Sequence, residues 1–560
     1  MSVTFQDLKD VDKVKTRRSH AILVGLGALI GILIFVLIYG VKILDPTYIG
    51  FIYNGDNDLK QHYIGWSQYR QCAWRFPIGL VDSLSYPTAI SVIYTDSIPL
   101  VACIFKLFSP ILPVDFQYFG LVGILSFALM GATSAILLNR FIKSIPTCIL
   151  LTPFFVASFP ILQRMYYHTA LAAHWLIIIA LILWVYDTAC EKANRYIVYW
   201  GLLGFFAVSI HTYYIPILGM VLLADCVTVF IFNKKSLFRA VMQIVTFCAA
   251  GLLSLWIFGG FYGNGSAVGF GLGTFGANFN TFINPIDYGV ILPNMGIQNY
   301  FQYEGCGYLG FGILILSVLA DVLFIVNKKK LEITKEQKTY LFVGLGLLLC
   351  SFGFATLPMI SIGEWTIGQI PYPEPIFKVL SIFRSNGRFI WVGMYLLMLI
   401  TVVAIERMLA SKPVILYGVI AAGLIFQFVD LSGMIAERQK FYRENHDVSI
   451  CWDTDINLAK MAAGKKSFIF MYDVNDLNME TAFYAYRNGM TLNSFYFARD
   501  INEDVKNQIN KYWDEIAGSN IRGDAVYLMK NEDFEANRDF IEGLPVYIYE
   551  YDGHRVITAK

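Results

Sequence analysis

Charged residues are scarce in this 560-residue sequence: Asp, Glu, Lys and Arg make up 15% of it, against roughly 25% in an average soluble domain. Hydrophobic residues make up 56%. The shortage of charge excludes an ordinary soluble protein, and the aliphatic and aromatic content excludes a disordered chain. The net charge of +1 lacks the excess of Lys and Arg that nucleic-acid binding requires. We therefore expect a membrane protein with no nucleic-acid partner.

Cysteine is present nine times, but the sequence lacks any CxxC pair. Most of these cysteines fall inside apolar segments, where a free cysteine behaves as a small hydrophobic residue. Neither a zinc site nor a disulfide framework is indicated by them.

Apolar runs of about 20 residues, the length that crosses a bilayer, recur along residues 21–432. The predicted inner turns contain Lys or Arg and the outer loop 260–306 contains neither, so the positive-inside rule places the N-terminal segment 1–20 in the cytoplasm. The stretch 97–112 is interrupted by Lys106, and we predict a half-buried or membrane-surface helix there. About 11 spans are predicted, near 21–44, 116–138, 146–162, 169–187, 196–212, 213–232, 239–259, 308–327, 339–358, 389–408 and 414–431.

Charge returns in the last part of the sequence, where residues 433–560 hold 36 of the 85 charged side chains. An odd number of spans places this segment on the outer side. Strand-like runs such as KSFIFMYD and PVYIYEYD alternate with helical stretches, and Asp552-Gly553 is typical of a hairpin turn before the last strand. We predict an extracytoplasmic α/β domain here, following a transmembrane body 21–432 with large outer loops at 45–115, 260–306 and 359–388.

Polar residues of the predicted body gather at the outer ends of the spans, and six of the seven histidines lie there or beyond. Charged groups at membrane depth cost about 2.5–3.5 kcal/mol, so they require a function or a partner. ATP and nucleotide sugars do not reach this boundary, so a donor substrate would have to be carried by a lipid. The residues predicted to line a site here are Gln61, His62, Trp66, Asp96, His174, His211 and Glu304.

Two aspartates, Asp56 and Asp58, follow the first span directly. A carboxylate beside a low-dielectric boundary can have a raised pKa, which suits it to act as a general base. Asp56 is the first candidate and Asp58 its rival, while simple solvation of the loop is the alternative interpretation. A divalent metal is a possible cofactor, and these two aspartates would then be its ligands; no other cofactor is predicted.

Basic residues near the same boundary are candidates for binding a lipid phosphate. Arg164 and His168 lie four residues apart and would share a face of a helix. Arg384 and Arg388 come just before a span, where an arginine could stabilise a phosphate leaving group. Anchoring to lipid headgroups is the alternative for each. We expect Glu304 to pair with one of these arginines rather than to act as a base.

Several motifs together resemble the GT-C superfamily of integral-membrane glycosyltransferases, and in particular an uncharacterised bacterial branch of it. The resemblance covers essentially the membrane body. The residues that carry it are Gly55-Asp56, Gln61-His62-Tyr63, Gly65-Trp66, Arg70, Trp74, Phe76-Pro77, Tyr86-Pro87, Tyr94–Pro99, FQYFG at 116–120, HW at 174–175, EGCGYLG at 304–310 and FRSNGRF at 383–389.

The resemblance implies a GT-C-like fold in the bacterial cytoplasmic (inner) membrane. It also implies transfer of a sugar, with inversion, from a polyprenyl-phosphate donor to a cell-surface glycan, lipid or other acceptor. An acidic residue of the first outer loop takes the acceptor's proton in that family, a role that would fall to Asp56 or Asp58. Arg388 and Arg164 would bind the donor phosphate. The sequence has no Asp-Glu pair after the first span, which leaves the base open, and it lacks the sequon-binding signature of oligosaccharyltransferases.

Two other functions are compatible with this reading. A non-catalytic binding or assembly protein would share the fold, and the sequence separates it poorly from an enzyme. A transporter or flippase of a lipid-linked solute is disfavoured, because transporters place charged or broken helices near the middle of the membrane. Here the polar residues lie at one face.

Overall fold

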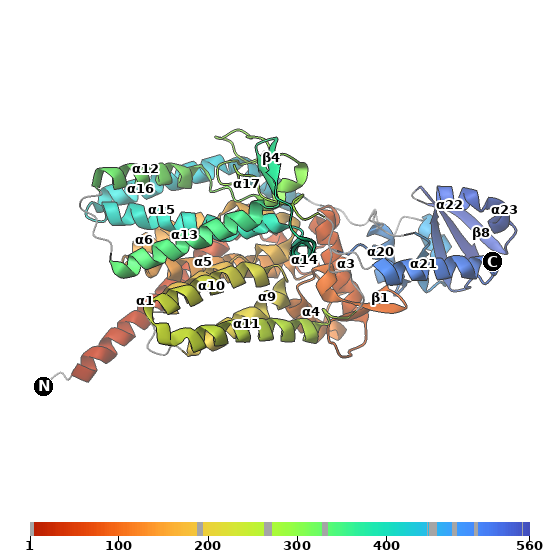
Figure 1. Cartoon of the computed structure of the whole chain (residues 1–560). Helices are drawn as coiled ribbons and strands as arrows, with labels where there is room; N and C mark the ends of the chain where they lie inside the picture. The colour runs from red at the N-terminus through yellow and green to blue at the C-terminus, as the bar shows by residue number, and fades with distance from the viewer. Residues whose placement is uncertain are drawn as a thin grey trace.

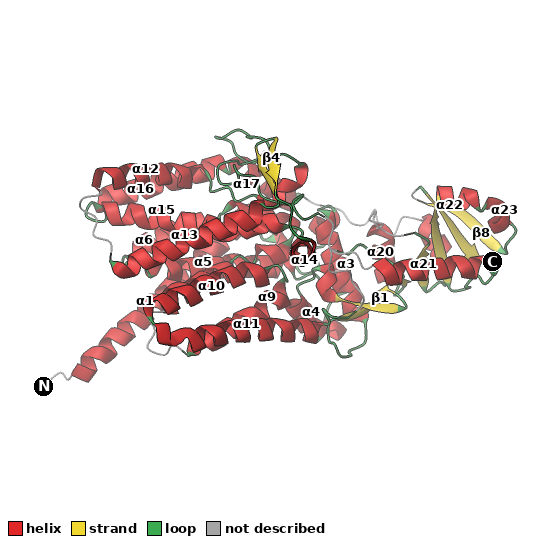
Figure 2. Ribbon diagram, in the orientation of Figure 1, coloured by secondary structure: helices red, strands yellow, loops and turns green. Residues whose placement is uncertain are grey.

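The computed structural model describes residues 5–187, 194–262, 271–327, 334–444, 446, 456–472, 479–497, 502–551 and 553–560. A bundle of long helices forms the body, and the N-terminus leaves it at one end (Figure 1). Loops and two hairpins lie at the other end, and the C-terminal domain extends beyond them. The strands are confined to that second end and to the C-terminal domain (Figure 2).

The described chain contains eight helices that are long and apolar enough to cross a bilayer, and a bent pair of helices adds a ninth span. Two shorter apolar helices, α9 (Arg195–Ile210) and α12 (Phe311–Asn327), match the remaining predicted spans. Each of the predicted spans is thus helical, and the protein is a multi-pass helical membrane protein. The eight long spans are α1 (Phe5–Tyr39), α5 (Phe119–Asn139), η4 with α8 (Thr169–Asp187), α10 (Tyr214–Phe232), α11 (Leu237–Phe258), α13 (Lys335–Thr356), η9 with α15 (Asn386–Leu409) and α16 (Pro413–Asp430).

Apolar side chains on the outside of the bundle are widely exposed. On α13, Phe342 is 74% exposed and Leu349 is 62% exposed. Such a surface is stable in hydrocarbon, where a helix also satisfies all of its own backbone hydrogen bonds. The bundle is therefore built to be surrounded by lipid.

The predicted span at 146–162 is a bent pair of helices rather than one straight helix. Helix α6 (Ile145–Val156) and helix α7 (Phe159–Tyr167) meet at 47°. Proline explains the break, since Pro153 lies inside α6 and Pro160 lies in the first turn of α7. A proline has no N–H to continue the helical ladder, but its fixed φ suits the start of a new helix.

The end of the bundle next to the C-terminal domain is covered by short elements (Figure 1). The predicted surface helix at 97–112 is confirmed as half-buried: in α4 (Pro99–Lys106), Cys103 is buried and Ile104 is exposed. The other short elements are η1 (Lys42–Leu44), α2 (Gly50–Tyr53), α3 (Asn57–Gln71), β1 (Leu80–Ser85), β2 (Thr88–Ser91), η2 (Val92–Thr95), η3 (Ser109–Ile111), η6 (Tyr300–Gly305), β3 (Met359–Ile362), β4 (Trp365–Gln369), α14 (Glu374–Leu380), η8 (Ser381–Phe383) and α17 (Ser432–Arg443).

The C-terminal domain contains a five-stranded mixed sheet of order β6-β5-β7-β9-β8. Strand β5 pairs in parallel with β6 and β7, while β9 pairs antiparallel with β7 and β8. The predicted α/β fold and the final hairpin are confirmed, although Asp552 of the turn lies outside the described residues. The elements are α19 (Ile456–Ala462), β5 (Ser467–Phe470), α20 (Met479–Arg487), β6 (Thr491–Leu492), α21 (Asn502–Ala517), β7 (Ala525–Lys530), α22 (Asn531–Ala536), α23 (Arg538–Glu542), β8 (Val546–Tyr551) and β9 (His554–Ala559).

One edge of this domain packs directly on the membrane body. Gln71, at the end of α3, donates a hydrogen bond to the backbone carbonyl of Tyr486 in α20 at 3.1 Å. The backbone N–H of Tyr86 donates to the carbonyl of Leu492 at 2.8 Å. These bonds hold the C-terminal domain near α3, the helix that begins beside the two candidate bases, Asp56 and Asp58.

Candidate functional site

The two candidate bases occupy different positions at the start of α3. Asp56 is the N-cap residue: its Oδ1 accepts a hydrogen bond from the backbone N–H of Asp58 at 3.0 Å. Aspartate is favoured at this position because it satisfies an otherwise unpaired N–H of the first helical turn. The side chain of Asp56 is thereby engaged with the backbone, whereas the carboxyl group of Asp58 is not used for capping.

Asp58 lies among other carboxylates in a partly enclosed position. Burial raises its pKa, and the negative charges of Asp56, Glu304 and Asp96 raise it further, to about 7. The positive charge of Arg388 acts in the opposite direction. A carboxyl group with this pKa exchanges its proton near neutral pH, which is the property that a general base needs.

A buried ion triad lies on the other side of the site. The Oε2 atom of Glu304 accepts hydrogen bonds from Nη2 of Arg164 and from Nε of Arg388, each at 2.8 Å. Burial alone would raise the pKa of Glu304, but the two guanidinium groups hold it well below its usual range. The expected pairing of Glu304 is confirmed, with two arginines rather than one. The triad carries one net positive charge.

Close backbone packing brings the members of the triad together. A Cβ atom built on Gly387 would lie 2.5 Å from the Cα of Gly305 and 2.6 Å from the carbonyl oxygen of Phe275. Any larger residue at position 387 would separate η9 from η6. Glycine is thus required here so that Arg388 and Glu304, the neighbours of these two glycines, can reach each other.

Arg384 remains available for a ligand. Its guanidinium group lies over the ring of Phe275 at 5.4 Å, and it makes no ion pair within the described part of the chain. It is half-buried. Arg164 and Arg388 are paired with Glu304, so Arg384 is the arginine of the set whose charge is least compensated.

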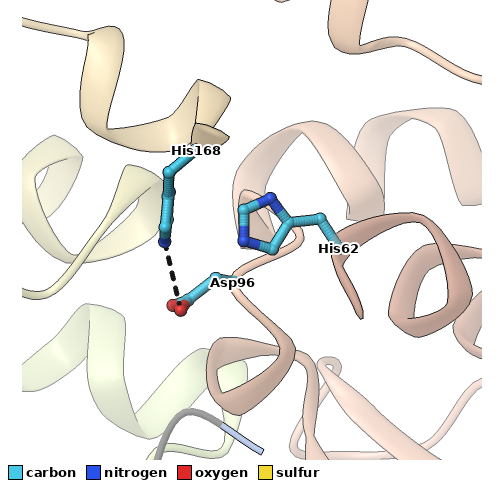
Figure 3. A group of neighbouring side chains, drawn as sticks. All are labelled: His62, Asp96 and His168. Atoms are coloured by element: carbon cyan, nitrogen blue, oxygen red, sulfur yellow. Dashed lines mark hydrogen bonds and ion pairs between the residues drawn. The ribbon is translucent and has the colours of Figure 1, made fainter. Parts of the chain in front are cut away.

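Histidines and an aspartate form a second polar cluster beside α3 (Figure 3). Nε2 of His168 lies 3.3 Å from Oδ2 of Asp96, and Nε2 of His211 lies 3.4 Å from its Oδ1. The ring centroids of His62 and His168 are 4.3 Å apart. Burial lowers the pKa of His62 and of His168, which favours the neutral imidazole in both.

The prediction that Arg164 and His168 share a helix face is wrong. Helix α7 ends at Tyr167, and His168 follows it with φ −155° and ψ 83°. The backbone therefore turns between the two side chains. Arg164 reaches Glu304, while His168 reaches Asp96.

The loop that carries Asp96 is fixed against α3. Ser97 donates a hydrogen bond from Oγ to the backbone carbonyl of His62 at 2.7 Å. A Cβ atom on Gly65 would lie 2.3 Å from the side chain of Thr95, so glycine is needed for this approach. Asp96 itself has φ 51°, a left-handed conformation that aspartate tolerates better than most residues.

Two residues that were predicted to line the site, Trp66 and His174, instead connect parts of the protein to each other. Trp66 is fully buried, and its indole N–H donates to the carbonyl of Phe116 at 2.9 Å. His174 is also fully buried, with Nδ1 at 2.9 Å from the hydroxyl of Tyr395. Both contacts hold elements of the bundle together, away from the carboxylates.

The C-terminal domain contributes a residue, Tyr496, that was not among the predicted site residues. Gln61 Nε2 donates to the carbonyl oxygen of Tyr496 at 2.9 Å. Burial raises the pKa of Tyr496 to about 12; the charge of Asp58 raises it as well, and that of Arg384 lowers it. Tyr496 is therefore close enough to both the candidate base and Arg384 to be affected by their charges. Its only signal in the sequence was the aromatic run SFYF at 494–497.

Comparisons with known proteins place the chain in a family. Residues 28–432 match the family described as a domain of unknown function (DUF6311), and residues 457–559 match the DUF6311 C-terminal domain. No curated protein matches the sequence.

Solved structures that align along most of the chain were also found. ArnT from Cupriavidus metallidurans bound to undecaprenyl phosphate aligns with 94% of this chain and 97% of that chain, at 12% identity and a TM-score of 0.44. The oligosaccharyltransferase from Archaeoglobus fulgidus in its apo form aligns with 93% of this chain and 71% of that chain, at 10% identity and a TM-score of 0.39. Since the family match on residues 28–432 covers well over half of the sequence, the chain belongs to the DUF6311 family.

Proposed function

We propose that this protein is a membrane glycosyltransferase that moves a sugar from a polyprenyl-phosphate-linked donor to a glycan or lipid acceptor at the outer face of the cytoplasmic membrane. The observation that carries the proposal is Asp58, a carboxyl group with a pKa of about 7 whose charged neighbours include Glu304 and Arg388. A proton acceptor and a set of phosphate-binding cations are the two parts that such a transfer needs.

Asp58 acts as the general base in this proposal. It removes the proton from an acceptor hydroxyl as the oxygen attacks the anomeric carbon of the sugar. Its pKa lies near the operating pH, where a base is most effective. Asp56 instead caps α3 through its side chain and keeps Asp58 in place.

The arginines stabilise the leaving lipid phosphate. Charge-assisted hydrogen bonds from guanidinium groups are well suited to phosphate oxygens. Arg384 binds the phosphate directly, because it has no carboxylate partner among the described residues. Arg164 and Arg388 keep a net positive charge behind it, since Glu304 neutralises only one of them.

The donor is expected to be lipid-linked because of where the site lies. The polar cluster lies at the end of an apolar bundle whose helices expose residues such as Phe342 to lipid. A polyprenyl chain fits that surface, and the sugar-phosphate head would reach the polar end. The GT-C-like motifs of the first outer loop favour the same class of donor.

Conservative replacement of each aspartate tests the assignment. Purified protein in lipid nanodiscs is incubated with a polyprenyl-phosphate sugar extract, and release of free polyprenyl phosphate is followed by mass spectrometry. Asp58→Asn is expected to lower the rate by about 10²–10⁴-fold, the usual contribution of a general base. Asp56→Asn is the matched control, because asparagine caps a helix as well as aspartate does. Wild-type turnover in Asp58→Asn would exclude the proposed role.

A further inference from the structure

The cluster of His62, Asp96 and His168 brings together three side chains from separate segments. His62 comes from α3, Asp96 from the residue after η2, and His168 from the end of α7. Each offers a ligand atom, and these three atoms lie within 4.8 Å of one another. In Figure 3 the ring of His62 points toward the space beside the His168–Asp96 pair.

We propose that the His62–Asp96–His168 cluster binds one divalent transition-metal ion, with Zn²⁺ as the best match. Imidazole nitrogens suit Zn²⁺, whereas Mg²⁺ and Ca²⁺ prefer sites made of oxygen atoms. Zinc–nitrogen bonds are about 2.0–2.1 Å long, which puts tetrahedral ligand atoms about 3.3 Å apart. The ligand atoms now lie within 4.8 Å of one another, so they would need to approach by up to about 1.5 Å to reach that geometry.

Buried ring nitrogens without hydrogen-bond partners indicate that the cluster binds a ligand. His62 is fully buried, and neither of its ring nitrogens has a hydrogen-bond partner among the residues that the structure describes. His168 is also buried, and its Nδ1 atom has no hydrogen-bond partner among the described residues either. Buried polar groups are nearly always satisfied, because leaving one unpaired costs about 1–3 kcal/mol. A metal ion would satisfy one of the two free ring nitrogens of His62, which no group among the described residues does.

The residues around the cluster fix its orientation. His211 accepts a hydrogen bond at Nδ1 from the backbone N–H of Tyr213 at 3.2 Å, so its Nε2 carries the proton and faces Asp96 at 3.4 Å. Its role is therefore to position the carboxylate of Asp96. Ser97 fixes the backbone of His62 in the same way. Outer partners of this kind are typical of metal sites and orient the ligands.

This site differs from the one expected from the sequence. Asp56 and Asp58 do not belong to it, and two imidazoles take their place. Three protein ligands would leave one position open for water or for an anionic oxygen of a substrate. The proposal does not depend on glycosyl transfer, because metal binding can be measured without any donor.

Metal content tests the site directly. The full-length protein is purified in detergent, treated with a chelator, incubated with Zn²⁺ alone, desalted and analysed by elemental mass spectrometry. We expect about one ion per chain and a higher apparent Tm in the loaded protein, since a ligand of the native state stabilises it. Less than about a tenth of an ion per chain in the wild type, after equilibration at a Zn²⁺ excess, would overturn the proposal.

Single substitutions test whether the ion binds at this cluster or at histidines elsewhere in the protein. His62→Ala and Asp96→Asn should lose the bound ion, and His211→Ala should weaken binding by about 10–100-fold, as expected for an outer partner. His446→Ala removes one imidazole that bonds the carbonyl of Phe441, and it should bind like the wild type. Equal Zn²⁺ content in His62→Ala and His446→Ala would contradict the assignment.

Two measurements on the wild type cover the case in which a variant does not fold. Co²⁺ bound at this site should give visible absorption and an electron paramagnetic resonance signal typical of nitrogen ligands. A large excess of Mg²⁺ should not displace Zn²⁺. Displacement by Mg²⁺, or a Co²⁺ signal of oxygen ligands alone, would show that the imidazoles do not hold the ion.

Discussion

Glu304 joins two buried arginines, because its Oε2 atom accepts hydrogen bonds from both Arg164 and Arg388 at 2.8 Å. The three residues come from α7, η6 and η9, which are far apart in the sequence. Without Glu304, two guanidinium groups would be buried side by side with no counter-charge. The carboxylate therefore both binds the segments together and sets the net charge of the site.

Replacing Glu304 tests this structural role. We expect Glu304→Gln to destabilise the protein by about 3–5 kcal/mol, the usual effect of removing one partner from a buried ion pair. The apparent Tm in detergent, followed by intrinsic fluorescence, provides the measurement. Glu374→Gln is the matched control, since its side chain is 77% exposed in an ion pair with Lys378 and should contribute little. Equal Tm values for the two variants would contradict the role of the triad.

The raised pKa of Asp58 predicts a pH dependence of activity. The base must be ionised, so transfer should increase with pH and level off above about 7. A low-pH limb with a midpoint near pH 4 would indicate an ordinary exposed carboxylate instead. The rate of polyprenyl-phosphate release under donor-limited conditions, measured from pH 5 to pH 9, gives this midpoint.

The same shift predicts an effect of pH on stability. Folding raises the pKa of Asp58 from 3.8 to about 7, so the folded state binds the proton more tightly than the unfolded state does. Its contribution to stability is complete below pH 3.8 and is lost as the pH rises toward 7. We therefore expect Asp58→Asn to raise the apparent Tm more at pH 8 than at pH 5. If the difference in Tm between Asp58→Asn and the wild type did not change with pH, the pKa of Asp58 would not be raised.

Arg384 should affect binding of the donor more than turnover. A charge-assisted hydrogen bond contributes about 1.5–3 kcal/mol, so Arg384→Gln is expected to raise the donor KM by about 10–150-fold while kcat changes less. Lys378→Gln removes a cation from α14, which precedes Arg384 in the chain, but this side chain is 60% exposed and pairs with Glu374. It should leave both constants unchanged. If the two variants behave alike, Arg384 does not bind the phosphate.

Much of the fold was predictable because the bilayer imposes a simple length and composition on each span. The eleven predicted spans all coincide with helices, and the alternating C-terminal runs form the expected sheet. The break at Ser158 was missed, since apolar composition continues across it and only Pro160 signals the new helix.

The site was predictable in content but less so in geometry. Sequence position identified Asp58, Glu304 and Arg384 as members of one polar face. Asp56 caps α3, and Asp58 keeps its carboxyl group free of the cap. These different roles depend on the residue at which α3 begins, and amino-acid composition does not indicate that residue. Contacts across hundreds of residues, such as that of Gln61 with Tyr496, have no local signal in the sequence.

The contact between Gln61 and Tyr496 predicts that the C-terminal domain helps to enclose the site. Gln61 is buried and donates to the carbonyl of Tyr496 at 2.9 Å, so Gln61→Leu would leave that carbonyl without its donor. An unpaired buried acceptor costs about 1–3 kcal/mol, so the segment 493–497 should separate from α3 more often.

Hydrogen exchange measured by mass spectrometry should therefore show faster exchange of that segment in Gln61→Leu. Gln508→Leu serves as the control: Gln508 also joins the domain to the body, donating to Thr88 at 3.2 Å, but from a partly exposed position. It should leave exchange at 493–497 unchanged because Gln508 bonds Thr88 of β2 rather than a residue of α3. Unchanged protection in Gln61→Leu would mean that the domain is held over the site by its other contacts, such as the bond between Gln71 and Tyr486.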